Sequence, residues 1–174
     1  MTVEAKRARC VLFDWGDTLM RDFPEFVGPM SAWPRVETIA HAQDALSALR
    51  SMGCFLALAT NAADSAESQI WEALRRGGLG GLLDRVYCLG NVGHRKPSAS
   101  FFEFILRDLA LARTDLVMVG DDYEVDVLGA NAAGIRAVWF SAGCEDERVG
   151  EMYRTVHDLA FLPQLLELWE SGAA

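Results

Sequence analysis

Five short, uninterrupted apolar runs limit what this chain can fold into. They lie at residues 10–13, 55–59, 86–89, 116–119 and 137–140. None alternates polar and apolar residues, which is typical of strands that are buried on both faces. Amphipathic segments with helical periodicity separate the runs and follow the last one, at about 34–52, 63–76, 97–109, 121–134 and 159–169. This alternation predicts an α/β fold, a three-layer α/β/α doubly wound parallel sheet.

The length and composition favour a single soluble domain. The chain has 174 residues, 51% of them hydrophobic, and shows no repeat or linker, so we expect one domain over 1–174. Residues 1–9 lack the apolar core of a signal peptide and no run is long enough to span a membrane. We therefore expect a cytoplasmic protein. The net charge of −9 argues against nucleic acids and anionic membranes as partners.

The four cysteines do not form a metal-binding pattern. Cys10, Cys54 and Cys88 lie in or beside apolar runs, Cys144 lies in a polar segment, and no Cys-x-x-Cys spacing occurs. This spacing does not fit a zinc site. We expect all four to be free thiols.

Polar side chains collect where the apolar runs end. Asp14, Gly16 and Asp17 follow the first run, and Thr60 and Asn61 follow the second. Lys96 precedes the third helical segment, and the fourth run leads into a group of aspartates, Asp121, Asp122 and Asp126. Because parallel strands end at one edge of a sheet, these residues should meet there.

Carboxylates gathered in this way favour a bound divalent cation. Ligation by oxygen atoms alone suits Mg2+, and a lysine and a hydroxyl on the same edge could hold a phosphate. The chemistry indicated is phosphoryl transfer with Asp14 as nucleophile. Each residue also has a structural alternative: Asp14 to Asp17 could form a turn, and Asp122 is most simply the N-cap of the next helix.

Four motifs resemble those of the haloacid dehalogenase-like (HAD) hydrolase superfamily. They are Phe-Asp-Trp-Gly-Asp-Thr-Leu at 13–19, Ala-Thr-Asn at 59–61, Arg-Lys-Pro at 95–97 and Val-Gly-Asp-Asp-Tyr-Glu-Val-Asp at 119–126. The resemblance covers about residues 9–140 and implies a Rossmann-like core. It also implies that Asp14 is nucleophile and metal ligand, with the Gly16 carbonyl and Asp121 as further ligands and Asp126 as a second-shell or water-mediated partner of the metal.

The same resemblance suggests roles for the remaining polar residues. Thr60, with Asn61 beside it, would bind phosphoryl oxygens, and Lys96 would neutralise both the nucleophile and the substrate phosphate. The resemblance thus implies a Mg2+-dependent phosphatase that forms an aspartyl-phosphate. Its substrate would be a phosphorylated small molecule or a phosphoprotein.

The chain departs from the family pattern in two places. The pattern Asp-x-Asp-Gly-Thr reads Asp-Trp-Gly-Asp-Thr here, so Gly16 replaces the aspartate that usually acts as general acid and base. Asp17 would take that role, or the step would run without an acid, or the segment 21–33 would supply one. The second departure is the lack of room for a cap domain, which predicts an open site. Capless relatives act on large substrates or form oligomers, so a homo-oligomer is possible.

Two other functions stay open at this stage. Loss of the acid at residue 16 would fit a catalytically weak or inactive phosphate-binding or protein-interaction module. Phosphonate or carbon–halogen hydrolysis is the other enzymatic alternative, although the absence of a cap argues against it. We expect the segment 21–33, with its two prolines, to be a loop with exposed aromatic residues.

Overall fold

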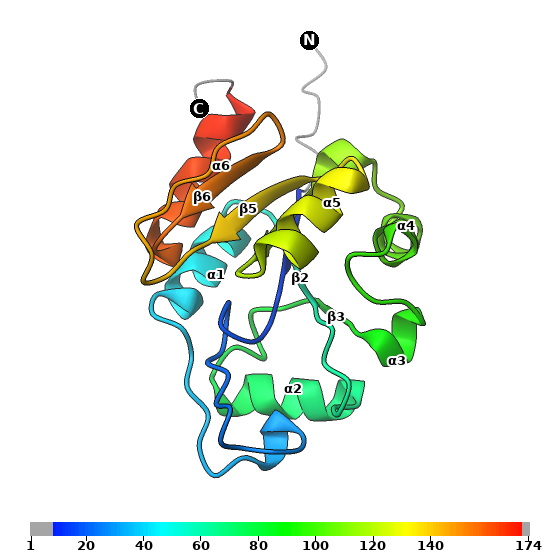
Figure 1. Ribbon diagram of the computed structural model, residues 1–174, viewed down its shortest axis with the longest axis vertical. Helices are drawn as coiled ribbons and strands as arrows, with labels where there is room; N and C mark the ends of the chain where they lie inside the picture. Colours follow the sequence, from blue (N-terminus) through cyan, green and yellow to red (C-terminus); the bar gives the residue numbers. More distant parts are fainter. Residues whose placement is uncertain (1–8, 172–174) are drawn as a thin grey trace.

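The fold is an all-parallel sheet between two layers of helices, as the sequence predicts (Figure 1). The sheet has six strands, one more than the five apolar runs predict. The computed structural model describes residues 9–171. The strand order is β3-β2-β1-β4-β5-β6. The strands are β1 (Cys10–Phe13), β2 (Phe55–Ala59), β3 (Arg85–Tyr87), β4 (Leu116–Gly120), β5 (Arg136–Phe140) and β6 (Tyr153–Val156).

The helices cover both faces of this sheet. They are α1 (Ala42–Ser51), α2 (Glu67–Arg76), α3 (Leu89–Val92), α4 (Ala99–Asp108), α5 (Gly129–Ala132) and α6 (Leu162–Glu170). Four further segments with 3-10 or π-helical geometry are η1 (Met30–Ala32), η2 (Arg113–Asp115), η3 (Tyr123–Leu128) and η4 (Leu159–Phe161). Along β1, Val11 and Phe13 pack with α1, α2 and α6, whereas Cys10 and Leu12 pack with α4 and α5. Two apolar cores therefore fix the register of the sheet.

The register brings the ends of three central strands together. Phe13, the last residue of β1, lies opposite Leu58 of β2 and Val119 of β4. The backbone N–H of Asp14 then donates to the Val119 carbonyl oxygen at 2.9 Å. The residues that follow β1, β2 and β4 consequently meet at one edge, which is where open parallel sheets bind ligands.

The first helical prediction, about 34–52, is too long at its N-terminal end. Helix α1 begins only at Ala42, after His41 adopts a left-handed backbone with φ 59°. Residues 37–39 instead pair with the segment that follows β1: the Arg21 N–H donates to the Glu37 carbonyl, and the Ile39 N–H donates to the Leu19 carbonyl. A long-range backbone pairing has displaced the first turns of the expected helix.

The segment 21–33 is a loop, but the prediction that its aromatic residues are exposed is wrong. Phe23 and Trp33 are buried, and their rings contact each other and Phe26 at centroid distances between 5.5 and 6.3 Å. The Arg35 guanidinium lies 4.5 Å from the centre of the Phe23 ring. This aromatic loop packs beside α2 through η1 and forms one wall of the candidate site.

Two further predictions can be compared with the structure. None of the four cysteines, all of which lie in the described part of the chain, forms a disulfide, as expected; Cys144 is exposed and the others are buried. Within residues 9–171, no helix combines the length and apolar character needed to cross a lipid bilayer.

Candidate active site

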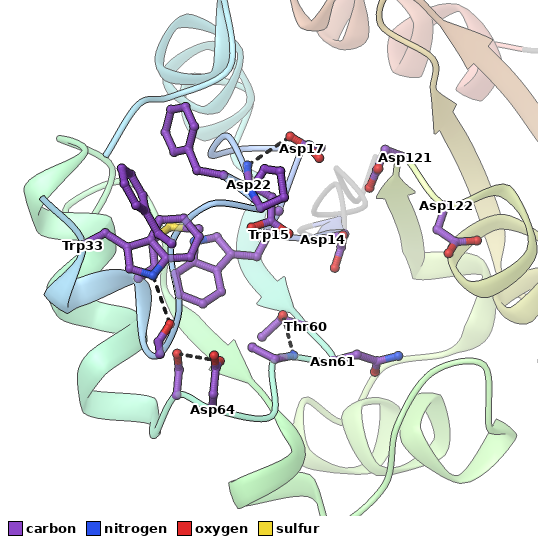
Figure 2. Close-up of a pocket in the computed structure, with 18 residues that line it drawn as sticks. Asp14, Trp15, Asp17, Asp22, Trp33, Thr60, Asn61, Asp64, Asp121 and Asp122 are labelled. Carbon is purple, nitrogen blue, oxygen red and sulfur yellow. Dashed lines mark hydrogen bonds between the residues drawn. The ribbon is translucent and has the colours of Figure 1, made fainter. Parts of the chain in front are cut away.

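A pocket of about 510 Å³ opens at the edge where β1, β2 and β4 end (Figure 2). Its walls come from the turn after β1, the aromatic loop, the turn after β2 and the turn after β4. Six of the residues that line it are aspartates, namely Asp14, Asp17, Asp22, Asp64, Asp121 and Asp122. The pocket is therefore strongly acidic, and Lys96 is the cation that the structure places against it.

Lys96 joins the carboxylates of Asp14, which follows β1, and Asp126, which follows β4. Its Nζ lies 2.8 Å from Asp14 Oδ1 and 2.6 Å from Asp126 Oδ1, and its side chain is 1% exposed. Burial alone would lower the pKa of Lys96, but Asp14 and Asp126 outweigh it and raise that pKa. Lys96 is consequently charged and holds Asp14 in a fixed orientation.

The close approach of Asp126 depends on Gly120 at the end of β4. A side-chain carbon at residue 120 would overlap the Asp126 carboxylate, so only glycine leaves the space. Asp126 Oδ2 accepts from the Asp122 N–H at 3.2 Å. Burial raises the pKa of Asp126 in spite of Lys96, and Asp14 raises it further, because one ammonium cannot neutralise both carboxylates.

Asp121 is held by Thr18 across the sheet edge. The Thr18 hydroxyl donates to Asp121 Oδ1 and accepts from the Asp121 N–H, both at 3.1 Å. The Trp139 indole N–H donates to the Asp121 carbonyl oxygen at 2.9 Å. Burial and the nearby Asp14 raise the pKa of Asp121 to about 6. The turn after β4 is thereby fixed with this carboxylate facing Asp14 (Figure 2).

Three of the four predicted metal-binding residues have carboxylates close enough to share a cation. One oxygen each from Asp14, Asp121 and Asp126 lies within 4.8 Å of the others. Three ionised carboxylates and one lysine leave two negative charges, which a dication would balance. Hard oxygen donors of this kind fit Mg2+. Gly16, the fourth predicted ligand, lines the same pocket.

Thr60 and Asn61 reach the site from the end of β2, but in different ways. Thr60 is buried, and its hydroxyl oxygen accepts from the Ala62 N–H at 3.1 Å, which leaves the O–H to donate into the pocket. The Asn61 amide forms two 2.9 Å hydrogen bonds with the backbone of Lys96, one to its N–H and one to its carbonyl. The substrate-binding role predicted for Asn61 stays a prediction, since Asn61 lines the pocket, and these contacts show in addition that it positions Lys96.

The turn after Gly16 directs Asp17 towards the aromatic loop. Asp17 has a left-handed backbone with φ 54°, and its Oδ1 accepts from the Asp22 N–H at 3.0 Å. Asp22 lies beside Gly16, and both residues line the pocket. Burial raises the pKa of Asp22, and the neighbouring Asp17 and Asp64 raise it further.

Asp122 caps the helix after β4, as predicted. Its Oδ1 accepts from the Val125 N–H at 3.0 Å. Sequence reasoning gave no role to Thr18 or Gly120, and it named the segment 21–33 as a possible source of an acid without singling out Asp22. Thr18 contacts Asp121 at the far side of the sequence, and Gly120 and Asp22 lie against Asp126 and Gly16 across irregular turns, so local spacing carried no signal for these contacts.

Comparison with known proteins places the chain in a family. The model of the haloacid dehalogenase-like hydrolase family matches residues 18–140. A phosphoserine phosphatase from Thermus thermophilus is 36% identical over 106 residues, which cover 61% of this chain and 41% of that enzyme. A ribulose-1,5-bisphosphate 5-phosphatase from Halopiger xanaduensis is 32% identical over 109 residues, which cover 63% of this chain and 44% of that enzyme.

The solved structures agree with this placement. An uncharacterised protein from Listeria monocytogenes superposes with a TM-score of 0.81 at 29% identity, and the match covers 94% of this chain and 99% of that one. The chain spans less than half the length of the two phosphatases, yet nearly the whole of this structural relative. The family match extends over most of the sheet and its helices. The chain therefore belongs to the haloacid dehalogenase-like hydrolase family.

Proposed function

We propose that the protein is a Mg2+-dependent phosphohydrolase that acts through an aspartyl-phosphate on Asp14. The observation that carries this proposal is the buried Lys96, held between Asp14 and Asp126 and surrounded by carboxylates that can share a dication. The two relatives that are named as phosphatases support it.

In the proposed reaction, a carboxylate oxygen of Asp14 attacks the substrate phosphorus and the bond to the leaving oxygen breaks. Lys96 holds the other carboxylate oxygen, Oδ1, in place and offsets negative charge on the phosphoryl group. The Thr60 hydroxyl donates to a phosphoryl oxygen. A water molecule then attacks the aspartyl-phosphate, which releases phosphate and restores Asp14.

Asp14, the Gly16 carbonyl and Asp121 would hold Mg2+, with Asp126 as its second-shell or water-mediated partner. When bound, the ion would offset negative charge on the phosphoryl oxygens and so reduce the repulsion between the Asp14 carboxylate and the substrate phosphate. Thr18 contributes by fixing the orientation of the Asp121 carboxylate.

The substrate is proposed to be a phosphorylated small molecule. The pocket volume of about 510 Å³ falls within the range of small-molecule sites, and one wall consists of aromatic and other apolar residues of the loop after β1. A phosphorylated protein side chain is the other candidate, because within residues 9–171 no cap domain closes over the site.

Replacing the nucleophile tests the proposal directly. Asp14→Asn should lower phosphatase activity by at least about 10³-fold, because an amide cannot attack phosphorus to form the intermediate. The wild type should bind beryllofluoride with Mg2+ as an aspartyl-phosphate mimic, detected by fluorine NMR. Hydrolysis by Asp14→Asn at the wild-type rate would contradict the covalent mechanism.

A non-catalytic phosphate-binding module is the second candidate, favoured by the absence of a carboxylate at Gly16. The two functions are separated by screening the wild type against phosphorylated metabolites with and without Mg2+. Turnover that requires Mg2+ supports the enzyme. Saturable phosphate binding without any turnover would support the module.

A further inference from the structure

The side chain of Asp22 occupies the space beside Gly16. A Cβ built on Gly16 would lie 3.5 Å from Asp22 Cβ, 3.7 Å from its Cγ and 3.6 Å from its Oδ2. A side chain at residue 16 would therefore lie in van der Waals contact with the Asp22 side chain, so the two would share this part of the pocket. Gly16 is two residues from Asp14, and all three residues line the same pocket.

The other carboxylates of the pocket are committed to different contacts. Asp14 binds Lys96, Asp121 binds Thr18, and Asp122 caps η3. Asp17 holds the Asp22 N–H. Asp64 follows β2 on another wall and has only a 3.5 Å contact with the Ser65 hydroxyl. Among the described residues that are not chain neighbours of Gly16, Asp22 is thus the pocket carboxylate that a side chain at residue 16 would meet.

Two features hold Asp22 in this position while leaving it accessible. The Asp17 carboxylate fixes its backbone N–H, and the next residue, Phe23, is anchored in the aromatic cluster. Asp22 itself is exposed to the pocket, as a group that exchanges protons with substrate and water must be.

We infer that Asp22 is the general acid and base of the reaction, an inference that rests on the proposed phosphatase function. As Asp14 attacks phosphorus, the Asp22 carboxylic acid gives its proton to the leaving oxygen, and the alcohol departs. The resulting Asp22 carboxylate then takes a proton from the water that attacks the aspartyl-phosphate. Phosphate leaves Asp14, and Asp22 is protonated again, so the cycle closes without another reactant.

The first test uses substrates whose leaving groups need protonation to different degrees. For Asp22→Asn, kcat/KM on alkyl phosphates should fall by about 10²–10⁴-fold, whereas kcat/KM on p-nitrophenyl phosphate should change little, because a good leaving group departs without an acid. Glu25→Gln is the matched control, because it removes one carboxylate charge from the same loop. Among the residues described, Glu25 forms an ion pair with Arg35 and does not line the pocket.

The second half of the cycle gives an independent readout. Without the base, hydrolysis of the aspartyl-phosphate becomes slow, so Asp22→Asn should release p-nitrophenol in a burst equal to the enzyme concentration, followed by a slow steady rate. A variant that combines Asp22→Ala with Gly16→Asp should recover alkyl phosphate hydrolysis, since an aspartate at residue 16 reaches the same part of the pocket. Gly16 does not have a positive φ, so the substitution causes no backbone strain.

Several results would overturn the inference. One is an Asp22→Asn variant that loses no more activity than Glu25→Gln on alkyl phosphates. A second is an Asp22→Asn variant that loses the same kcat/KM on alkyl phosphates and on p-nitrophenyl phosphate, shows no burst of p-nitrophenol and is not rescued by Gly16→Asp. A third is a selective loss on alkyl phosphates that appears in Asp17→Asn or Asp64→Asn and not in Asp22→Asn. Failure of the proposed function itself is distinguishable, because it would appear as an active Asp14→Asn variant or a wild type that never forms an aspartyl-phosphate.

Discussion

Asp121 and Asp122 are adjacent in sequence but serve different purposes. The Asp121 carboxylate faces Asp14 and is held there by Thr18, whereas the Asp122 carboxylate turns to the first turn of η3 and binds the Val125 N–H. Substitution of each residue should therefore change a different property of the protein.

For Asp122, the expected effect is on stability. Asp122→Ala should lower the free energy of unfolding by about 1 kcal/mol, because the Val125 N–H loses its cap. Asp122→Asn should lose much less, since asparagine is an equally good N-cap. Urea unfolding of the two variants measures the difference, and equal losses would contradict the capping role.

For Asp121, the expected effect is on metal dependence. Asp121→Asn should raise the Mg2+ concentration needed for half-maximal activity at least about tenfold, because it removes one of the proposed ligands. Its stability without metal should be equal to or above that of the wild type, since a carboxylate beside Asp14 is lost. An unchanged Mg2+ requirement would remove Asp121 from the ligand set.

At the scale of elements, the segment between β1 and α1 forms one wall of the pocket. Residues 37–39 pair with the backbone around Met20, and the aromatic loop packs against α2 through η1. The Arg76 guanidinium on α2 also donates to the Ser31 carbonyl at 2.8 Å. A wall of the pocket is thus held by packing rather than by a separate domain.

Trp33 is the residue that tests this role of the loop. It is 8% exposed, contacts Phe23 and Phe26, and donates from its indole N–H to the Gly28 carbonyl at 3.0 Å. Trp33→Ala should cost about 3–5 kcal/mol of stability, as for other buried tryptophans, and raise KM by loosening the wall. Trp33→Phe keeps most of the packing and should cost less. Thermal unfolding with steady-state kinetics measures both effects.

At the scale of the whole molecule, excess negative charge is concentrated where the sheet ends. The net charge is −9, and six aspartates line one pocket. Repulsion among them opposes folding, since burial and mutual proximity disfavour the ionised forms. A cation bound in the folded state alone should therefore stabilise the entire domain.

Adding Mg2+ should raise the melting temperature of the protein. At 100 times its dissociation constant, the ion should contribute about 2.7 kcal/mol, a shift of roughly 5–10 °C for a domain of this size. Calorimetry of the wild type checks this, with NaCl at matched ionic strength as the control for screening. Asp14→Asn should respond less than the wild type, and an equal shift with NaCl would argue against a specific site.

The sequence alone determined the central sheet and the residues that gather at its edge. Five continuous apolar runs can satisfy their backbones and bury both faces only as parallel strands, and parallel strands end on one side. The positions of Asp14, Thr60 and Asp121 follow from that rule, whereas Lys96 and Asp126 reach the same edge from the helical segments and turns that follow β3 and β4. These features depend on local patterns, which a single sequence displays directly.

Only the tertiary structure decided the features that depend on irregular or edge segments. Strand β6 was not predicted, because Tyr153–Val156 is a half-exposed edge strand that forms by pairing with β5. The burial of the aromatic loop, the engagement of Asn61 with Lys96 and the position of Asp22 beside Gly16 likewise join residues without a common period. Such contacts are set by how turns pack against the finished sheet, and residue spacing does not encode that packing.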